Sequence, residues 1–195
     1  SVSFKSSAAD SKTLPAVEIA YHLVDTTVRF TFGEKLALGE GVLHIEFTGI
    51  LNGDMAGFYK SMYSDADGKK MTMGSTQFEA LDARRAFPCW DEPAKKAVFE
   101  VTLIFDDNLI AVSNTPVVEE TAAGPGLKSV RFGETPIMST YLLAFVVGDL
   151  VSIEQGAANN TTVGIYTTRG KENQAQFALD TSVKLLGYFN DYFGI

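Results

Sequence analysis

An amide and a carboxylate stand two residues apart at the start of the most charged and least regular stretch of the chain. This stretch covers residues 76 to 93 and reads TQFEALDARRAFPCWDEP. Its first residues, 76 to 79, have a composition typical of a short strand. In an extended strand alternate side chains share a face, so Gln77 and Glu79 would point to one spot while Phe78 points into the core. We therefore predict that Gln77 and Glu79 form part of the wall of a ligand-binding site.

The other charges of this stretch favour a structural role. They are Asp82, Arg84, Arg85, Asp91 and Glu92. Opposite charges at this density can neutralise one another as hydrogen-bonded pairs beneath an irregular loop. We assign these five residues to the architecture of the loop and to a domain interface. The same structural interpretation stays open for Gln77 and Glu79.

Residues that commonly catalyse reactions or bind metals are scarce. Cys89 is the only cysteine, no histidine lies near it in sequence, and we interpret it as a packed side chain rather than a nucleophile. The only histidines, His22 and His44, do not form His-Glu-x-x-His, the motif in which two imidazoles one helical turn apart bind a zinc ion. We expect both to face solvent on strands. The sequence therefore predicts no catalytic residue and no metal ligand in this chain.

Composition limits the class of protein. The 195 residues carry a formal net charge of −8 and are 46% hydrophobic, which describes a globular protein and excludes disorder. The negative charge argues against nucleic acid and against an anionic membrane surface as partners. No apolar run is long enough for a membrane span, and a single cysteine cannot form an internal disulfide. These features favour a cytoplasmic location.

Hydrophobic periodicity predicts a mainly β fold. Apolar side chains alternate with polar ones over 17–23, 28–32, 43–48 and 99–105, as in half-buried antiparallel strands. The apolar run 141–147 indicates a central strand, and residues 1 to 13 are expected to form a loop or frayed end. Many short strands with turns between them favour a β-sandwich or a saddle-shaped pair of sheets. One amphipathic helix is predicted from Lys171 to Phe193, ending at Gly194.

The stretch 76–93 resembles the signature of the N-terminal domain of the M1 zinc aminopeptidases. FTGILNGDMAGFYKSMY (47–63), NTPV (114–117), TPIMSTYLLAFVVGDL (135–150) and YFNDYFGI (188–195) support the resemblance, which covers roughly residues 14 to 195. It implies that residues 1–168 form the N-terminal β domain and that 169–195 form the first helix of a catalytic domain. It also implies that Gln77 and Glu79 accept hydrogen bonds from the protonated amino terminus of a peptide substrate.

The resemblance further implies a zinc ion in the full-length enzyme, with ligands outside this chain, so the 195 residues alone are expected to be inactive. Family members carry leading strands before the equivalent of Leu14. We therefore expect an unpaired sheet edge, or one completed by another polypeptide, and a fragment of a longer enzyme. Two alternatives remain: a stand-alone β-sandwich binding module without catalytic activity, and an epoxide hydrolase resembling the leukotriene hydrolases.

Overall fold

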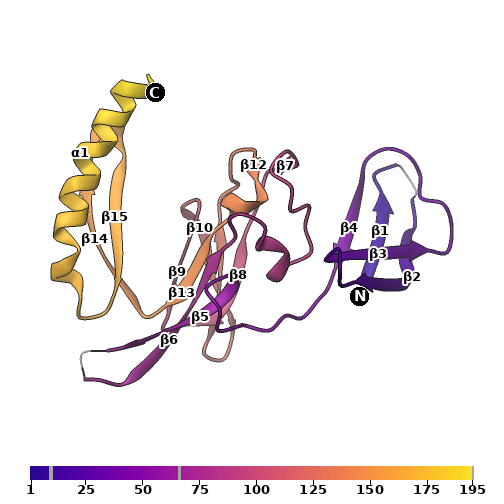
Figure 1. The fold of residues 1–195 in the computed structure, drawn as a ribbon, viewed down its shortest axis with the longest axis horizontal. Helices are drawn as coiled ribbons and strands as arrows, with labels where there is room; N and C mark the ends of the chain where they lie inside the picture. Colours follow the sequence, from indigo (N-terminus) through magenta and orange to yellow (C-terminus); the bar gives the residue numbers. More distant parts are fainter. Residues whose placement is uncertain (9–10, 66, 195) are drawn as a thin grey trace.

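A computed structural model describes residues 1–8, 11–65 and 67–194. Three groups of elements follow one another along the long axis of the molecule: an N-terminal sheet, a central pair of sheets, and a C-terminal hairpin covered by a helix (Figure 1). All strand pairs within the sheets are antiparallel. The predicted mainly β fold with one C-terminal helix is therefore confirmed.

The N-terminal sheet has the strand order β3-β2-β1-β4. Its strands are β1 (Val2–Ser6), β2 (Thr13–His22), β3 (Thr27–Phe32) and β4 (Gly41–Ile45). The expectation of a loop or frayed end over residues 1 to 13 is wrong for Val2–Ser6, while Ala9 and Asp10 lie outside the described residues. The backbone of β1 pairs with β2 on one side and β4 on the other, and Val2 is buried. A five-residue alternation among small polar residues was too short to be recognised from the sequence.

The central part contains two larger sheets and a short strand pair. One sheet has the order β5-β6-β13-β9 and the other β10-β11-β8, while β7 pairs with β12. The strands are β5 (Gly57–Ser64), β6 (Lys70–Gln77), β7 (Lys96–Ala97), β8 (Thr102–Asp106), β9 (Ile110–Ser113), β10 (Val117–Gly124), β11 (Leu127–Phe132), β12 (Met138–Ser139) and β13 (Phe145–Gly148). Two apolar clusters fill this part, one around Phe78 and Leu143 and the other around Val130 and Phe132.

The predicted central strand over residues 141–147 is only partly correct. A 3₁₀ turn, η2 (Thr140–Leu142), occupies the first half of the run, and the strand itself is β13. β13 does lie between β6 and β9 in its sheet. The apolar side chains of the first half are nonetheless used in packing, since Leu143 is buried against Phe78. A continuous apolar run therefore indicated burial correctly and backbone geometry incorrectly.

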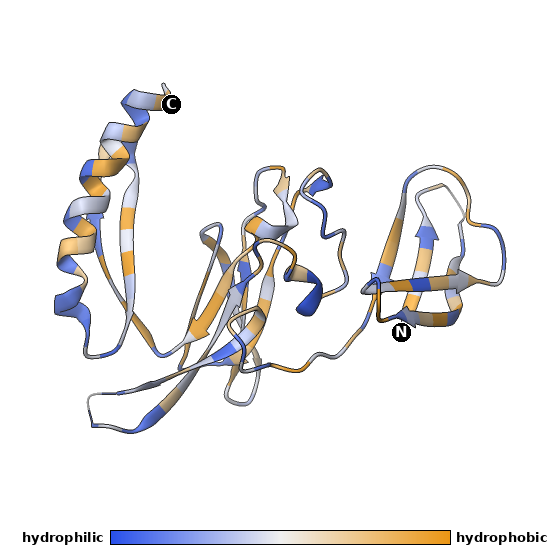
Figure 2. Ribbon diagram, in the orientation of Figure 1, coloured by the Kyte–Doolittle hydropathy of each residue, from blue (hydrophilic) through white to orange (hydrophobic). Residues whose placement is uncertain are grey.

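The C-terminal part is a β-hairpin with a helix packed against it. β14 (Leu150–Gly156) and β15 (Thr162–Thr168) form the hairpin, and α1 (Gln176–Phe193) packs on both strands. The predicted helix starts later than expected, because a 3₁₀ turn, η4 (Glu172–Gln174), precedes it. It ends at Gly194 as predicted, with φ of 70° in the left-handed region that glycine adopts without steric cost. Hydrophobic and hydrophilic residues alternate along α1 (Figure 2).

The remaining 3₁₀ turns are η1 (Ala83–Arg85) and η3 (Ala158–Asn160). Among the described residues, no helix is long and apolar enough to cross a membrane.

Candidate functional site

Gln77 and Glu79 lie at the end of β6, where the chain leaves the central sheet. Both side chains are exposed, and Phe78 between them is 2% exposed. The exposure of these residues matches the prediction, but the predicted strand over residues 76–79 ends at Gln77, and Glu79 lies in a turn. The Phe78 ring packs edge-on against Phe87 and Phe145, with centroid separations of 5.9 and 6.2 Å. Phe78 thus anchors the segment in the core and leaves its two neighbours outside.

The two polar side chains keep most of their hydrogen-bonding capacity. The Gln77 side-chain Nε2 donates to the backbone carbonyl of Glu79 at 3.3 Å, which ties the pair together. Within the described parts of the chain, the Gln77 amide oxygen and the Glu79 carboxylate have no hydrogen-bond or ion-pair partner. An exposed amide oxygen and an exposed carboxylate two residues apart in the chain are acceptors suited to a ligand that carries several N–H donors and a positive charge.

The nearby arginines are engaged by aspartates of their own loop. Arg84 donates from its backbone N and its Nε to Asp91 Oδ2, at 3.1 and 2.8 Å, and Asp91 is buried. This hydrogen bond raises the pKa of the Arg84 guanidinium above its ordinary value. Arg85 Nε contacts Asp82 Oδ1 at 2.9 Å. These four residues therefore form loop pairs as predicted, and neither arginine neutralises Glu79.

Arg84 also connects two parts of the fold. Its Nη1 donates to Thr26 Oγ1 at 2.7 Å, and Thr26 lies in the turn between β2 and β3. This hydrogen bond attaches the stretch 76–93, called the signature loop from here on, to the N-terminal sheet. The turn itself requires an uncommon backbone, since Thr26 has a φ of 52°.

Cys89 is half-buried, and it is the free cysteine of the described chain. Burial, with a further contribution from the Asp91 carboxylate, raises the pKa of its thiol to about 11. A thiol that stays protonated at neutral pH is a poor nucleophile and a poor metal ligand. The interpretation of Cys89 as a packed residue therefore agrees with its environment.

The two histidines do not form a metal site. His22 and His44 are both exposed, and His44 Nε2 lies 3.5 Å from Glu46 Oε1. Within residues 1–8, 11–65 and 67–194, no group of three or more His, Cys, Asp or Glu side chains is arranged to hold a metal ion. A catalytic zinc requires three protein ligands, so the described residues do not fit that ion.

A hydrophobic cleft separates the signature loop from the N-terminal sheet. It has a volume of about 1100 Å³ and is lined by Ile19, Tyr21, Phe30, Leu43 and Trp90, among others. Tyr21 is 74% and Trp90 71% exposed. The alternating residues of β2 therefore do not face a closed core, as half-buried strands would. Periodicity identified this apolar face but contained no information about what lies opposite it. Gln77 and Glu79 do not line this cleft.

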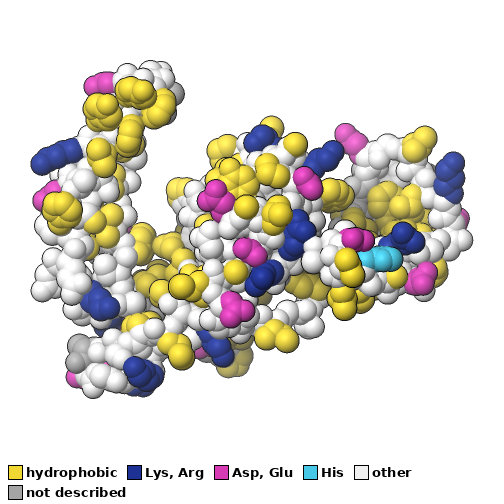
Figure 3. Space-filling view, in the orientation of Figure 1, with side chains coloured by type: hydrophobic (Ala, Val, Ile, Leu, Met, Phe, Trp, Pro, Cys, Tyr) yellow, Lys and Arg dark blue, Asp and Glu magenta, His cyan; other side chains and the backbone are white. Residues whose placement is uncertain are grey.

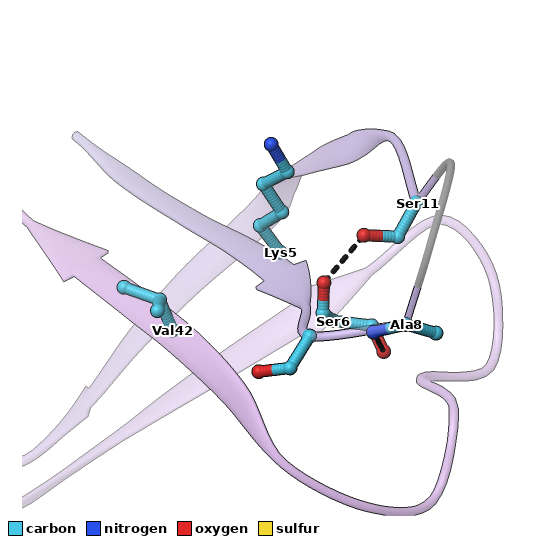
Figure 4. A pocket seen from close by; sticks show the side chains of 6 residues that line it. Lys5, Ser6, Ala8, Ser11 and Val42 are labelled. Carbon is cyan, nitrogen blue, oxygen red and sulfur yellow. Dashed lines mark hydrogen bonds between the residues drawn. The ribbon is translucent and has the colours of Figure 1, made fainter.

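A second, smaller hollow, with a volume of about 500 Å³, lies at the end of β1 (Figure 4). It is lined by Lys5, Ser6, Ser7, Ala8, Ser11 and Val42. The Ser11 hydroxyl donates to the carbonyl of Ser6 and is occupied by that contact. One lysine and a few hydroxyls without a neighbouring base do not make a nucleophile.

Comparison with known proteins shows the family to which this chain belongs. Residues 2–142 match the model of the peptidase M1 N-terminal domain. The chain therefore belongs to the peptidase M1 N-terminal domain family.

Several aminopeptidases are similar to nearly the whole chain. It is 52% identical over 176 residues to Aminopeptidase M1-B of Oryza sativa subsp. japonica, covering 90% of this chain and 20% of that protein. It is 45% identical over 187 residues to Aminopeptidase M1 of Arabidopsis thaliana, covering 96% of this chain and 21% of that protein. It is 43% identical over 169 residues to Aminopeptidase N of Acetobacter pasteurianus, covering 87% and 47%. The chain thus spans about a fifth of the length of the plant relatives it matches.

Proposed function

We propose that this chain is the substrate-recognition domain of a zinc aminopeptidase that removes N-terminal residues from peptides. Gln77 and Glu79 accept hydrogen bonds from the protonated amino terminus of the substrate. The observation that supports this proposal is the exposed, unneutralised Gln77–Glu79 pair held in place by the buried Phe78. The family of the chain and its aminopeptidase relatives support the class of reaction, which is the removal of N-terminal residues from peptides.

The physical basis of the specificity is the desolvation of the ammonium group. A protonated amino terminus loses its hydration on entering a cleft, and acceptors with negative charge must replace the lost water. The Glu79 carboxylate supplies charge and the Gln77 amide oxygen an oriented acceptor. An internal peptide bond has no ammonium group, so it gains nothing from the pair, and the enzyme acts as an exopeptidase.

The rest of the reaction belongs to residues outside this chain. The proposed enzyme would hold a zinc ion in a separate catalytic domain, and that ion would supply the Lewis-acid chemistry of peptide hydrolysis. The described residues contribute no ligand to it. Their part is to bind and orient the amino end of the peptide, and by themselves they hydrolyse nothing.

The division at residues 168 and 169 follows from the same proposal. Residues 1–168 are the aminopeptidase N-terminal β domain, and 169–195 begin the catalytic domain, with Ile195 outside the described residues. Aromatic side chains remain uncovered at the C-terminal end of α1: Tyr188, Phe189, Tyr192 and Phe193 are between 44% and 68% exposed. Hydrophobic side chains gather at this end of the helix in Figure 3. Such a cluster is typical of a surface that packs against a further domain.

We place the enzyme in the cytoplasm.

The direct test uses the full-length enzyme with Gln77→Ala and Glu79→Ala, assayed on an aminoacyl-arylamide. Each loss of a charged or oriented hydrogen bond should lower kcat/KM by about 10- to 100-fold, with Glu79→Ala the more severe. The matched control is Glu119→Ala. Glu119 forms an exposed ion pair with Arg131, and its replacement should leave kcat/KM unchanged. Unaltered kcat/KM in Glu79→Ala would show that the pair does not bind substrate.

A further inference from the structure

A glycine at the start of β5 occupies a site where no other residue fits. Gly57 is the strand partner of Gln77, so the two residues lie opposite each other at the end of the central sheet. It is buried and has a φ of 72°, in the left-handed region. Other residues adopt this backbone conformation only with strain. Gly57 therefore combines an unusual backbone with a position directly beside the candidate substrate-binding residue.

The space beside Gly57 is filled by Arg85. A Cβ added to Gly57 would lie 2.6 Å from Arg85 Cβ and 3.4 Å from the carbonyl oxygen of Asp82. A carbon–carbon approach of that length is far below the optimal separation of about 3.5–4.0 Å. Any side chain at position 57 would consequently displace the backbone of the turn that contains Asp82 and Arg85.

That turn is closed on the segment that carries Glu79. The backbone N–H of Asp82 donates to the carbonyl of Phe78 at 2.9 Å, and Ala83 is completely buried. Arg85 is fixed in turn by its contact with Asp82, with 2.9 Å between Nε and Oδ1. Glu79 thus lies in a tight loop, with the Phe78 anchor before it and the turn against Gly57 after it.

Gly57 itself is held from the other side by Asn52. The side-chain Nδ2 of Asn52 donates to the carbonyls of Ala56 and Phe58, at 3.1 and 3.2 Å, which flank Gly57 in sequence. The Asn52 side-chain oxygen accepts from the backbone N–H of Asp54 at 2.7 Å. The backbone on both sides of Gly57 is therefore restrained, and the glycine cannot yield to a displaced turn.

We propose that Gly57 and Arg85, packed against each other, are positioning residues that fix Gln77 and Glu79 relative to one another. Gly57 holds the strand end at Gln77, and Arg85 holds the turn that follows Glu79. Their contact therefore sets the geometry of the two acceptors, although neither residue touches the substrate. The catalytic consequence rests on the proposed function of the pair, whereas the structural consequence is measurable without it.

The structural arm of the test uses nuclear magnetic resonance on the 195-residue chain. Gly57→Ala should shift the Gln77 side-chain amide and the Glu79 backbone amide. Gly68→Ala is the matched control, because Gly68 also has a positive φ, 80°, but an added Cβ meets nothing within 4 Å. A second substitution, Arg85→Gly, removes the opposing Cβ and should restore both resonances in Gly57→Ala. Arg85→Ala, which retains that Cβ, should not restore them.

The catalytic arm uses the same variants in the full-length enzyme. A misplacement of about 1 Å at a substrate-positioning group can cost about 100-fold in rate, so kcat/KM in Gly57→Ala should fall by about 10- to 100-fold. It should recover at least partly with Arg85→Gly and not with Arg85→Ala. If Gly57→Ala does not fold, Arg85→Gly alone replaces it and should shift the two resonances more than Arg85→Ala.

Four outcomes separate the inference from the function on which it rests. Unshifted Gln77 and Glu79 resonances in Gly57→Ala overturn the positioning role, as does equal rescue by Arg85→Gly and Arg85→Ala. Normal kcat/KM in Glu79→Ala overturns the proposed function instead. Shifted resonances with reduced kcat/KM, both restored by Arg85→Gly, support the positioning role and its catalytic consequence together.

Discussion

Replacement of Phe78 by alanine tests whether this ring anchors the exposed pair. Phe78 is 2% exposed and lies in a cluster with Ala83 and Leu143, packed edge-on against Phe87 and Phe145. Removing a fully buried aromatic side chain forfeits about 2–3 kcal/mol of transfer free energy. The cavity it leaves, with the two lost ring contacts, adds about 1–2 kcal/mol. We expect the free energy of unfolding to fall by about 4 kcal/mol.

Urea denaturation followed by circular dichroism measures this change. With an m-value of about 2 kcal/mol/M, the midpoint should move down by about 2 M. Phe177→Ala is the matched control, because Phe177 is 81% exposed on α1 and its truncation should change stability by less than about 0.5 kcal/mol. A loss below about 1 kcal/mol in Phe78→Ala would mean that the ring is not an anchor. The reason for the outward orientation of Gln77 and Glu79 would then be lost.

Three further outcomes follow from the loop and its composition. Asp91→Asn should lower the free energy of unfolding by about 1–3 kcal/mol, because it leaves the half-buried Arg84 without its counter-charge. Thermal unfolding should show a larger loss of stability in Asp91→Asn than in Glu119→Gln, which removes the charge of an exposed ion pair. Alkylation of Cys89 by iodoacetamide should accelerate about tenfold per pH unit from pH 8 to 10, since the pKa of its thiol is raised to about 11, and a plateau by pH 9 would contradict the buried environment. The thiol of Cys89 stays protonated in the folded protein at pH values above about 8.5, where the thiol of the unfolded chain loses its proton. The contribution of Cys89 to stability is therefore fully present below pH ~8.5 and is lost as the pH rises towards 11. The isolated 195-residue chain should not hydrolyse an aminoacyl-arylamide, and chelator-sensitive turnover by the pure chain would refute the assignment of zinc to another domain.

Local alternation predicted the exposed Gln77 and the buried Phe78, because side-chain direction in an extended backbone depends only on sequence spacing. Glu79 is also exposed as predicted, but it lies in a turn after β6, where this rule does not apply. Charge density predicted that the charged residues of this loop pair with one another, but not which ones; the structure pairs Arg84 with Asp91 and Arg85 with Asp82. The end of α1 at Gly194 was equally readable, since a glycine after an amphipathic run is a common helix stop.

Features that depend on distant packing were not predictable. The short β1 strand forms because β2 and β4 offer backbone partners on both sides, which its five residues alone do not reveal. The role of Gly57 could not be predicted from the sequence for the same reason. The atom that would clash with a side chain at this position is the Cβ of Arg85, 28 residues later. The cleft between Tyr21 and Trp90 likewise depends on how the N-terminal sheet lies against the signature loop.

The central claim is that Glu79, together with Gln77, recognises the charged amino end of a peptide. Its most direct test is calorimetric titration of the full-length enzyme, wild type and Glu79→Gln, with a dipeptide analogue and with its counterpart lacking the amino group. Glu79→Gln retains the shape of the side chain but removes its charge. We predict that the preference for the amine-bearing ligand falls by about 10- to 100-fold in Glu79→Gln, because a charge-assisted hydrogen bond contributes about 1.5–3 kcal/mol. An equal preference in both proteins would contradict the account.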